Sequence, residues 1–162
     1  MTLIATPKAT NANSLATVAQ ADIYHSGRLH NAEWTSATED NKGKALIMAT
    51  TGLMILVYKG VKTLAAQSLK HPRTGLYDDD GNSIDSDIIA QQMINAVSEY
   101  AFLLLIKDST REGGDKGVNK IKVGPIDLDF NALDRAKSIP PAVTDMIKQW
   151  IINFNTVGVV RG

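Results

Sequence analysis

Residues 86–107, SDIIAQQMINAVSEYAFLLLIK, decide the fold of this chain. Their apolar residues recur at three- and four-residue steps, which is the period of an amphipathic α-helix with one broad buried face. Ser86 can cap the start of such a helix, and Asp87 falls in the first turn, where the helix dipole favours an acid. Lys107 stands at the other end, where the dipole favours a cation. The stretch therefore predicts a core helix over Ser86–Lys107.

Three further stretches carry a helical period and are expected to pack around that helix. Gly52 lies within the second, where it either permits a close helix crossing or is a tolerated weakness of up to ~1 kcal/mol relative to alanine. Trp34 lies between the first two, where its usual role is an anchor packed on the bundle and a contact with a partner is the less common one. The three predicted helices cover residues 14–27, residues from 36 or 38 to 56, and residues 140–154.

The hydrophobic period changes to two residues in 118–130, which predicts a β-hairpin whose first-strand lysines lie near second-strand aspartates. Residues 1–13 and 155–162 have no helical pattern and are expected to form extended arms. The fold class is therefore mainly α, a small helical bundle with one β-hairpin and extended N- and C-terminal arms. A chain of 162 residues is most simply one domain, 1–162, with a body over 14–154.

The bulk composition excludes several classes of function. Seventeen basic and seventeen acidic side chains cancel, so no global field attracts nucleic acid or an anionic membrane. The absence of cysteine excludes disulfides, thiolate catalysis and cysteine-bound zinc. The longest apolar run, Leu53–Tyr58, is too short to cross a bilayer, and the opening residues do not resemble a secretory signal. We expect a soluble protein with no membrane partner.

No catalytic or cofactor motif is recognisable, so we expect neither enzymatic activity nor a cofactor. A long loop over 58–85 contains the acidic run Asp78–Asn82, whose spacing departs from that of a calcium loop and favours a solvated turn. His25, His30 and His71 do not share a metal-ligand spacing and are interpreted as surface or loop residues. A loop of this length in a compact domain is often functional.

Two other regions are candidate interaction sites. The segment before and within the hairpin is mildly basic, so one copy would bind DNA weakly, whereas a ring of copies could line a pore with positive charge. The β-branched C-terminal tail suggests strand addition to a neighbouring subunit. The candidate channel-facing residues are Arg111, Lys116, Lys120 and Lys122, and the candidate subunit-contact residues are Val157, Val159, Val160 and Arg161.

Three stretches, in their order along the chain, resemble one phage protein family that is named for DnaT-like single-stranded-DNA binding. They are Asn11–His25, which contains NANS and VAQADIYH, His71–Gly81, which begins HPRTGLYD, and Val123–Phe130, VGPIDLDF. The middle stretch matches the family's central loop, although His71 stands where the family pattern has a tryptophan before Pro-Arg-Thr-Gly. The motif-loop residues are Pro72, Arg73, Thr74, Gly75 and Tyr77.

Members of this family also resemble the small helical head-to-tail connector, or adaptor, proteins of tailed phages. That resemblance implies a structural virion protein that forms a homo-oligomeric ring, commonly of twelve subunits, beneath the portal protein. The C-terminal tail would contact the portal or the next subunit. The ring would pass double-stranded DNA, without sequence specificity, to a tail or nozzle protein during genome packaging and DNA ejection.

Two alternatives to the adaptor stay open. A single-stranded-DNA-binding or replication accessory protein should show aromatic stacking platforms beside basic residues. The aromatic residues Trp34, Phe102, Trp150 and Phe154 lie on or beside apolar stripes instead, which favours the adaptor. A tail terminator ring would share most features of the adaptor.

Overall fold

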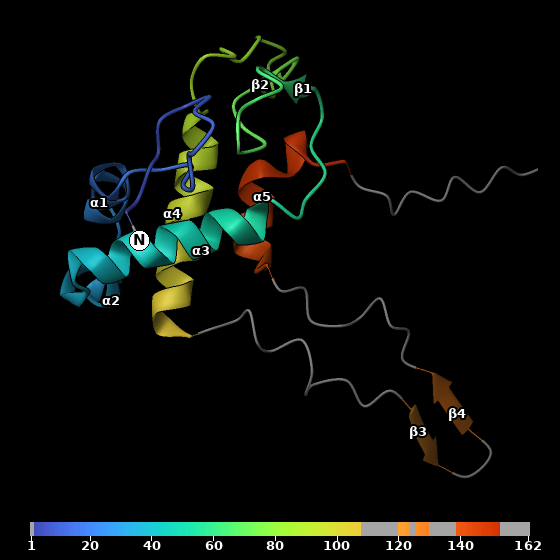
Figure 1. Ribbon diagram of the computed structural model, residues 1–162. Helices are drawn as coiled ribbons and strands as arrows, with labels where there is room; N and C mark the ends of the chain where they lie inside the picture. The colour runs from blue at the N-terminus through green and yellow to red at the C-terminus, as the bar shows by residue number, and fades with distance from the viewer. Residues whose placement is uncertain (1, 108–119, 124–125, 130–138, 153–162) are drawn as a thin grey trace, which may run out of the picture.

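The protein is a small helical bundle built around one central helix (Figure 1). The computed structural model describes residues 2–107, 120–123, 126–129 and 139–152, with only the backbone described in the two middle ranges. The predicted fold, mainly α with one β-hairpin, is confirmed. The helices are α1 (Val18–Ser26), α2 (Ala32–Ser36), α3 (Glu39–Leu53), α4 (Gln91–Ile106) and α5 (Pro141–Ile147), followed by a 3₁₀ turn at Lys148–Trp150, and the strands are β1 (Val61–Lys62), β2 (Arg73–Thr74), β3 (Lys120–Val123) and β4 (Ile126–Asp129).

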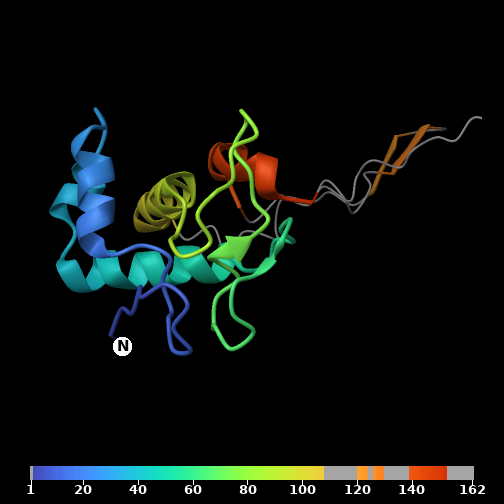
Figure 2. The ribbon, with the colours of Figure 1, turned by 90° about the horizontal axis from the view of Figure 1, so that it is seen from above.

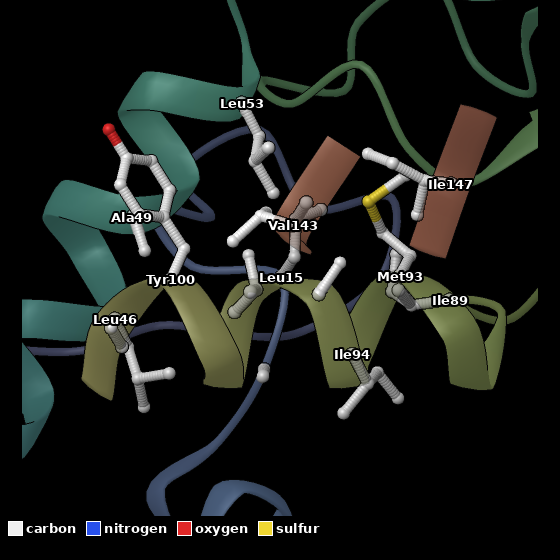
Figure 3. Packing of buried hydrophobic residues seen from close by; sticks show 14 of the residues in the cluster. Leu15, Leu46, Ala49, Leu53, Ile89, Met93, Ile94, Tyr100, Val143 and Ile147 are labelled. Atoms are coloured by element: carbon white, nitrogen blue, oxygen red, sulfur yellow. The ribbon is translucent and has the colours of Figure 1, made fainter. Parts of the chain in front are cut away.

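Helix α4 is the element against which the other helices pack, as predicted. Helix α3 crosses it, with α1 on one side of α4 and α5 on the other (Figure 2). Aliphatic side chains from these helices fill the space between them, together with the ring of Tyr100 (Figure 3). None of the helices in the described ranges is long and apolar enough to span a bilayer. The buried residues shared by this core include Leu15, Leu46, Ala49, Leu53, Met93, Val143 and Ile147.

Gly52 allows α3 and α4 to approach each other closely. A Cβ atom at this position would lie 2.7 Å from Cε1 of Tyr100, which is closer than real Cβ contacts. Tyr100 is itself buried, with 1% of its surface exposed, so it has little room to move aside. The close crossing is therefore the correct one of the two interpretations of Gly52, and a larger residue would overpack the core.

The predicted start of the central helix at Ser86 is wrong, because other hydrogen bonds hold the residues before Gln91. The carbonyl of Ser86 accepts a hydrogen bond from Thr63 Oγ1 at 2.8 Å. The side chain of Asp87 forms an ion pair with Lys8 at 2.9 Å rather than standing in a first helical turn. Helix α4 therefore begins at Gln91, five residues later than predicted.

Helix α1 also begins later than predicted. Ser14 is buried and its Oγ donates to the carbonyl of Ala16 at 2.6 Å, so it does not cap the helix. Thr17 takes that place in a capping box with Gln20. Thr38 caps α3, which confirms one of the two predicted starts of that helix. Helix α5 is shorter than predicted, because it passes into the 3₁₀ turn.

Residues 2–13 contain no helix or strand, as expected, but they fold back on the body. The backbone N–H of Asn13 donates to the carbonyl of Ile4 at 2.9 Å, and the side chain of Asn13 accepts from the N–H of Ile4 at 2.7 Å. Ser68 Oγ donates to the carbonyl of Ala12 at 2.6 Å. The N-terminal segment is thus tied to the long loop between α3 and α4.

The hairpin β3–β4 has the predicted arrangement of charged residues. Its register places Lys120 opposite Asp129 and Lys122 opposite Asp127. Cross-strand pairs of opposite charge contribute roughly 0.2–1 kcal/mol each. The other residues proposed for the channel or for subunit contacts, Arg111, Lys116, Val157, Val159, Val160 and Arg161, lie outside the described residues.

Candidate functional site

The loop that joins α3 to α4 separates its charges into two blocks. Residues 58–77, here named the cationic loop, contain four basic residues and no acidic residue. Residues 78–87, here named the acidic segment, contain five aspartates and no basic residue. The basic residues of the cationic loop are Lys59, Lys62, Lys70 and Arg73. A chain with zero net charge therefore carries one locally positive region beside a locally negative one.

Arg73 organises the cationic loop by binding backbone carbonyls. Its Nε donates to the carbonyl of Lys59 at 2.7 Å, and its Nη1 donates to the carbonyl of Lys70 at 3.1 Å. Its Nη2 donates to the carbonyls of Tyr58 and Gly60. Burial lowers the pKa of Arg73, but a guanidinium stays charged in proteins. Four of its five donors are thus used to shape the loop, and its positive charge is not cancelled.

The lysines of the cationic loop also contact backbone carbonyls or solvent and not carboxylates. Lys70 Nζ donates to the carbonyl of Leu56 at 2.7 Å, and Lys62 Nζ donates to the carbonyl of Ala65 at 3.2 Å. Lys59 is exposed. Among the ion pairs of the described residues, none involves a basic residue of the cationic loop. Within the described residues, the four cations therefore keep their positive charge with no carboxylate in ion-pair contact.

A small framework holds the cationic loop in shape. Strand β1 pairs with β2 in an antiparallel sheet that the sequence did not predict. Gly60 has a φ of +67°, and a Cβ atom there would lie 2.3 Å from the carbonyl oxygen of Thr74, so only glycine fits this approach of two backbones. The side-chain amide of the buried Gln67 donates to the carbonyls of Leu69 and Pro72, both at 2.9 Å.

The interpretation of the histidines as surface or loop residues is wrong for His25, which is buried within α1, whereas His30 is exposed and His71 lies in the loop but is buried there. His71 is 3% exposed, because its ring packs edge-on against Tyr58 with 4.5 Å between the ring centroids. His25 is 1% exposed and stacks between Trp34 and Phe102. Burial lowers the pKa of His25 and lowers the pKa of His71 to about 3, so both rings are neutral at pH 7.

Tyr77 lies at the boundary between the cationic loop and the acidic segment, with 57% of its surface exposed. Its carbonyl accepts a hydrogen bond from Nε1 of Trp150 at 2.8 Å. The carbonyl of Trp150 in turn accepts from the backbone N–H of Lys59 at 2.8 Å. The buried Trp150 therefore anchors the backbones of an exposed lysine and an exposed tyrosine, the first through its carbonyl and the second through its indole.

Trp34, Trp150 and Phe102 lie in the core, as predicted.

The acidic run forms the predicted solvated turn. The carboxylate of Asp78 accepts hydrogen bonds from the backbone N–H groups of Asp80 and Asn82, at 3.0 and 2.7 Å, and from the Asn82 side chain at 3.0 Å. These bonds, with that from the Asn82 side chain the largest cause, lower the pKa of Asp78. No group of three residues able to hold a metal ion occurs in the part of the chain that the structure describes.

The five motif-loop residues of the sequence analysis all lie in the cationic loop, whereas the three lysines beside them were missed. Arg73 and Thr74 form β2, Pro72 is buried before it, and Gly75 and Tyr77 are exposed after it. The sequence does contain a signal for these lysines: no acidic residue occurs from position 41 to position 77, so the basic residues of this stretch have no neighbour in the sequence that could cancel their charge. The lysines themselves are Lys59, Lys62 and Lys70.

One protein family matches residues 1–162, the full length of the chain, and its description is "Putative DnaT-like ssDNA binding protein". No curated protein and no solved structure matches the chain. The resemblance to this family is therefore confirmed over the whole sequence.

The predicted function as a head-to-tail adaptor is wrong, because the family is described by single-stranded-DNA binding and not as a virion connector. The prediction relied on the resemblance of the family to connector proteins and on aromatic residues that lie on apolar stripes, while the net charge of zero was interpreted as the absence of a field that attracts nucleic acid. That sum hides the separation of basic from acidic residues within 58–87. The predicted ring of twelve subunits, its protein partners and a place in the virion stay predictions. The chain belongs to the family with the description "Putative DnaT-like ssDNA binding protein".

Proposed function

We propose that this protein binds single-stranded DNA through the cationic loop, without base-sequence specificity. One observation carries the proposal: the four basic residues of the loop are held by carbonyl groups or exposed, and none has a carboxylate partner among the described residues. A phosphate backbone supplies the missing negative charge. The description of the family supports the same ligand.

The lysines are the groups suited to phosphate contact. A lysine ammonium has three donors, so Lys62 and Lys70, each with one bond to a carbonyl, keep two donors for another acceptor. Arg73 has used four of its donors and acts mainly by shaping the loop. Neutralisation of about three to four phosphates gives a slope of log K against log salt of roughly −2 to −3 for a single strand. Non-specific binding of this kind has a Kd of about 10⁻⁴ to 10⁻⁶ M.

A matched pair of charge reversals tests the proposal. Fluorescence anisotropy with a labelled oligo-dT would be measured over a salt series for the wild type, Lys59→Glu and Lys44→Glu. Both lysines are exposed and both substitutions change the charge by the same amount, but Lys44 is paired with Asp40 on α3. We expect Lys59→Glu to weaken binding about tenfold and Lys44→Glu less than about twofold at low salt. Equal losses in both variants, or no binding by the wild type, would overturn the proposal.

The proposal contains no catalytic step. We expect the oligonucleotide to keep its length and its label after prolonged incubation with the protein, with and without magnesium and ATP. A denaturing gel checks this directly, and any cleavage or strand modification that follows the protein through purification would contradict it.

A further inference from the structure

Tyr77 is the aromatic residue of the described structure that presents its ring to solvent. It is 57% exposed, whereas the other described phenylalanine, tyrosine and tryptophan residues are buried or half-buried. Tyr24 is half-buried and donates its hydroxyl to Glu99 at 3.1 Å. The buried aromatic residues of the described ranges are Trp34, Tyr58, Tyr100, Phe102 and Trp150. Among these residues, Tyr77 is therefore the one whose ring is open to stack on a base.

The backbone of Tyr77 is fixed on three sides. Tyr77 forms a β-bridge with Ser83, and the N–H of Asp78 donates to the carbonyl of Asn82 at 2.9 Å. The preceding Leu76 is 2% exposed, so it anchors the chain in the core. The third restraint is the hydrogen bond from the Trp150 indole to the Tyr77 carbonyl. A tyrosine on a fixed backbone has only two side-chain torsions left to order when it binds a partner.

The surrounding charges suit a single strand that crosses Tyr77. On one side, the backbone N–H of the exposed Lys59 donates to the carbonyl of Trp150, whose indole donates to the carbonyl of Tyr77, so one buried residue anchors both. On the other side, the acidic segment begins at Asp78 and repels phosphate. A strand would therefore place its phosphates toward Lys59 and leave a base free to cover the ring. An aromatic face beside uncompensated cations is the arrangement that binds unpaired bases without sequence preference.

We infer that Tyr77 is a stacking platform for one unpaired base and that it makes the cationic loop prefer single strands to duplex. This inference rests on the proposed function. Its physical basis is that the bases of a duplex are already stacked on each other, so only a single strand can offer a free base face to the ring. The same exposed ring could instead anchor a protein partner, and the experiment below separates these two roles.

The experiment compares two ligands of equal length and charge. One is an oligo-dT, and the other is an abasic deoxyribose-phosphate strand; each is titrated against the wild type, Tyr77→Ala and Tyr77→Phe. We expect Tyr77→Ala to weaken binding of oligo-dT about tenfold while binding of the abasic strand and the salt slope stay unchanged. Tyr77→Phe keeps the aromatic face and should stay within about twofold of the wild type. Tyr77→Ala should also lose the preference of the wild type for single-stranded over duplex DNA.

Other results would overturn the inference. Equal weakening of both ligands by Tyr77→Ala would show that the ring supports the loop and does not touch a base. If Tyr77→Ala binds both ligands as tightly as the wild type does, the ring does not contact the DNA. Its remaining role would then be to anchor a protein partner. Failure of the wild type to bind either strand would overturn the proposed function, and the platform with it. Thermal unfolding of each variant shows that the substitution has not removed the fold.

Discussion

The helical body and the cationic loop hold their basic residues in opposite ways. Outside the cationic loop, four basic residues form ion pairs with carboxylates. Within the cationic loop, the basic residues contact backbone carbonyls or solvent instead. An ion pair cancels charge, but a carbonyl holds a cationic side chain and leaves its charge in place. The pairs outside the cationic loop are Lys8–Asp87, Arg28–Glu99, Lys42–Asp22 and Lys44–Asp40.

Under the proposed function, this difference would let a chain with no net charge bind an anionic polymer. The positive charge is concentrated by leaving acidic residues out of one loop and not by adding basic residues to the whole protein. Within the body, by contrast, the cations serve the fold. Removal of a paired cation from the body should therefore change stability and leave binding unchanged, whereas a change to a cation of the cationic loop should change binding.

The largest expected effect comes from breaking the pair of Arg28 with Glu99. Glu99 is 8% exposed, and its Oε2 accepts hydrogen bonds from both Arg28 and Tyr24. Arg28→Ala leaves this carboxylate without its cation, which should lower the free energy of unfolding by about 2–3 kcal/mol, less than for a fully buried pair because Arg28 is partly exposed. Urea unfolding measures the loss. The folded variant should bind oligo-dT like the wild type.

A second substitution tests this cause. Glu99→Gln added to Arg28→Ala removes the unpaired charge, so it should recover more than half of the lost stability. If the double variant is no more stable than the single one, the loss comes from the packing of Arg28 over the Phe102 ring, which its guanidinium carbon approaches at 4.3 Å from the centroid.

The next largest effect is a loss of folding stability at low pH, caused by His71 in the cationic loop. Burial lowers the pKa of His71 to about 3, whereas the unfolded histidine titrates near 6.5. The unfolded state therefore binds more protons between these values, and stability falls as the pH falls from about 6.5 toward 3. From pH 7 to pH 5 the loss due to His71 should be about 2 kcal/mol. His71→Phe keeps a ring against Tyr58 and should flatten that part of the pH profile.

A second buried histidine, in the helical body, contributes to the same dependence of stability on pH. Its buried histidine, His25, also has a pKa lowered by burial, so its protonation adds to the same slope. His71→Phe should therefore reduce the slope without abolishing it. A profile unchanged by His71→Phe would mean that the ring of His71 meets water in the folded protein.

Exchange of Arg73 for lysine should have a smaller effect, confined to the cationic loop. Lysine keeps the charge but cannot reach the four carbonyls that the guanidinium fork binds. We expect Arg73→Lys to reduce stability by about 1 kcal/mol and affinity for oligo-dT about fivefold. Hydrogen exchange should rise for the N–H of Thr63, which donates to the carbonyl of Pro72 across the loop. The exchange Lys44→Arg in the body should change neither quantity.

The helices could be predicted from the sequence because their apolar residues repeat with the helical period. That pattern placed the body of α4 correctly, and the acidic residues Glu39 and Asp40 limited the start of α3 to Ser36 or Thr38, of which Thr38 is the cap. It could not place the start of α4, since Ser86 and Asp87 are held by Thr63 and Lys8, which are distant in the sequence. Helix ends depend on such contacts, and periodicity contains no information about them.

The candidate site was harder to predict for the same reason. The motif-loop residues could be named, but the role of Arg73 depends on carbonyls up to fifteen residues away. The burial of His71 follows from its packing on Tyr58, which no spacing rule indicates. The charges were in principle readable, and the error there was to add them over the whole chain instead of over each segment.

The smallest expected effect tests whether the acidic segment limits the cationic loop. Asp80 is exposed, and its side chain is not needed for the turn that Asp78 holds, so Asp80→Asn should remove one negative charge and leave the backbone unchanged. We expect affinity for oligo-dT to rise about twofold at low salt and not at all at about 1 M salt, where screening extends over only ~3 Å. Asp40→Asn is the matched control, since it frees Lys44 from its partner on α3. If freeing Lys44 raises affinity as much as Asp80→Asn does, any uncompensated cation attracts DNA equally, and the difference between body and loop does not locate the site.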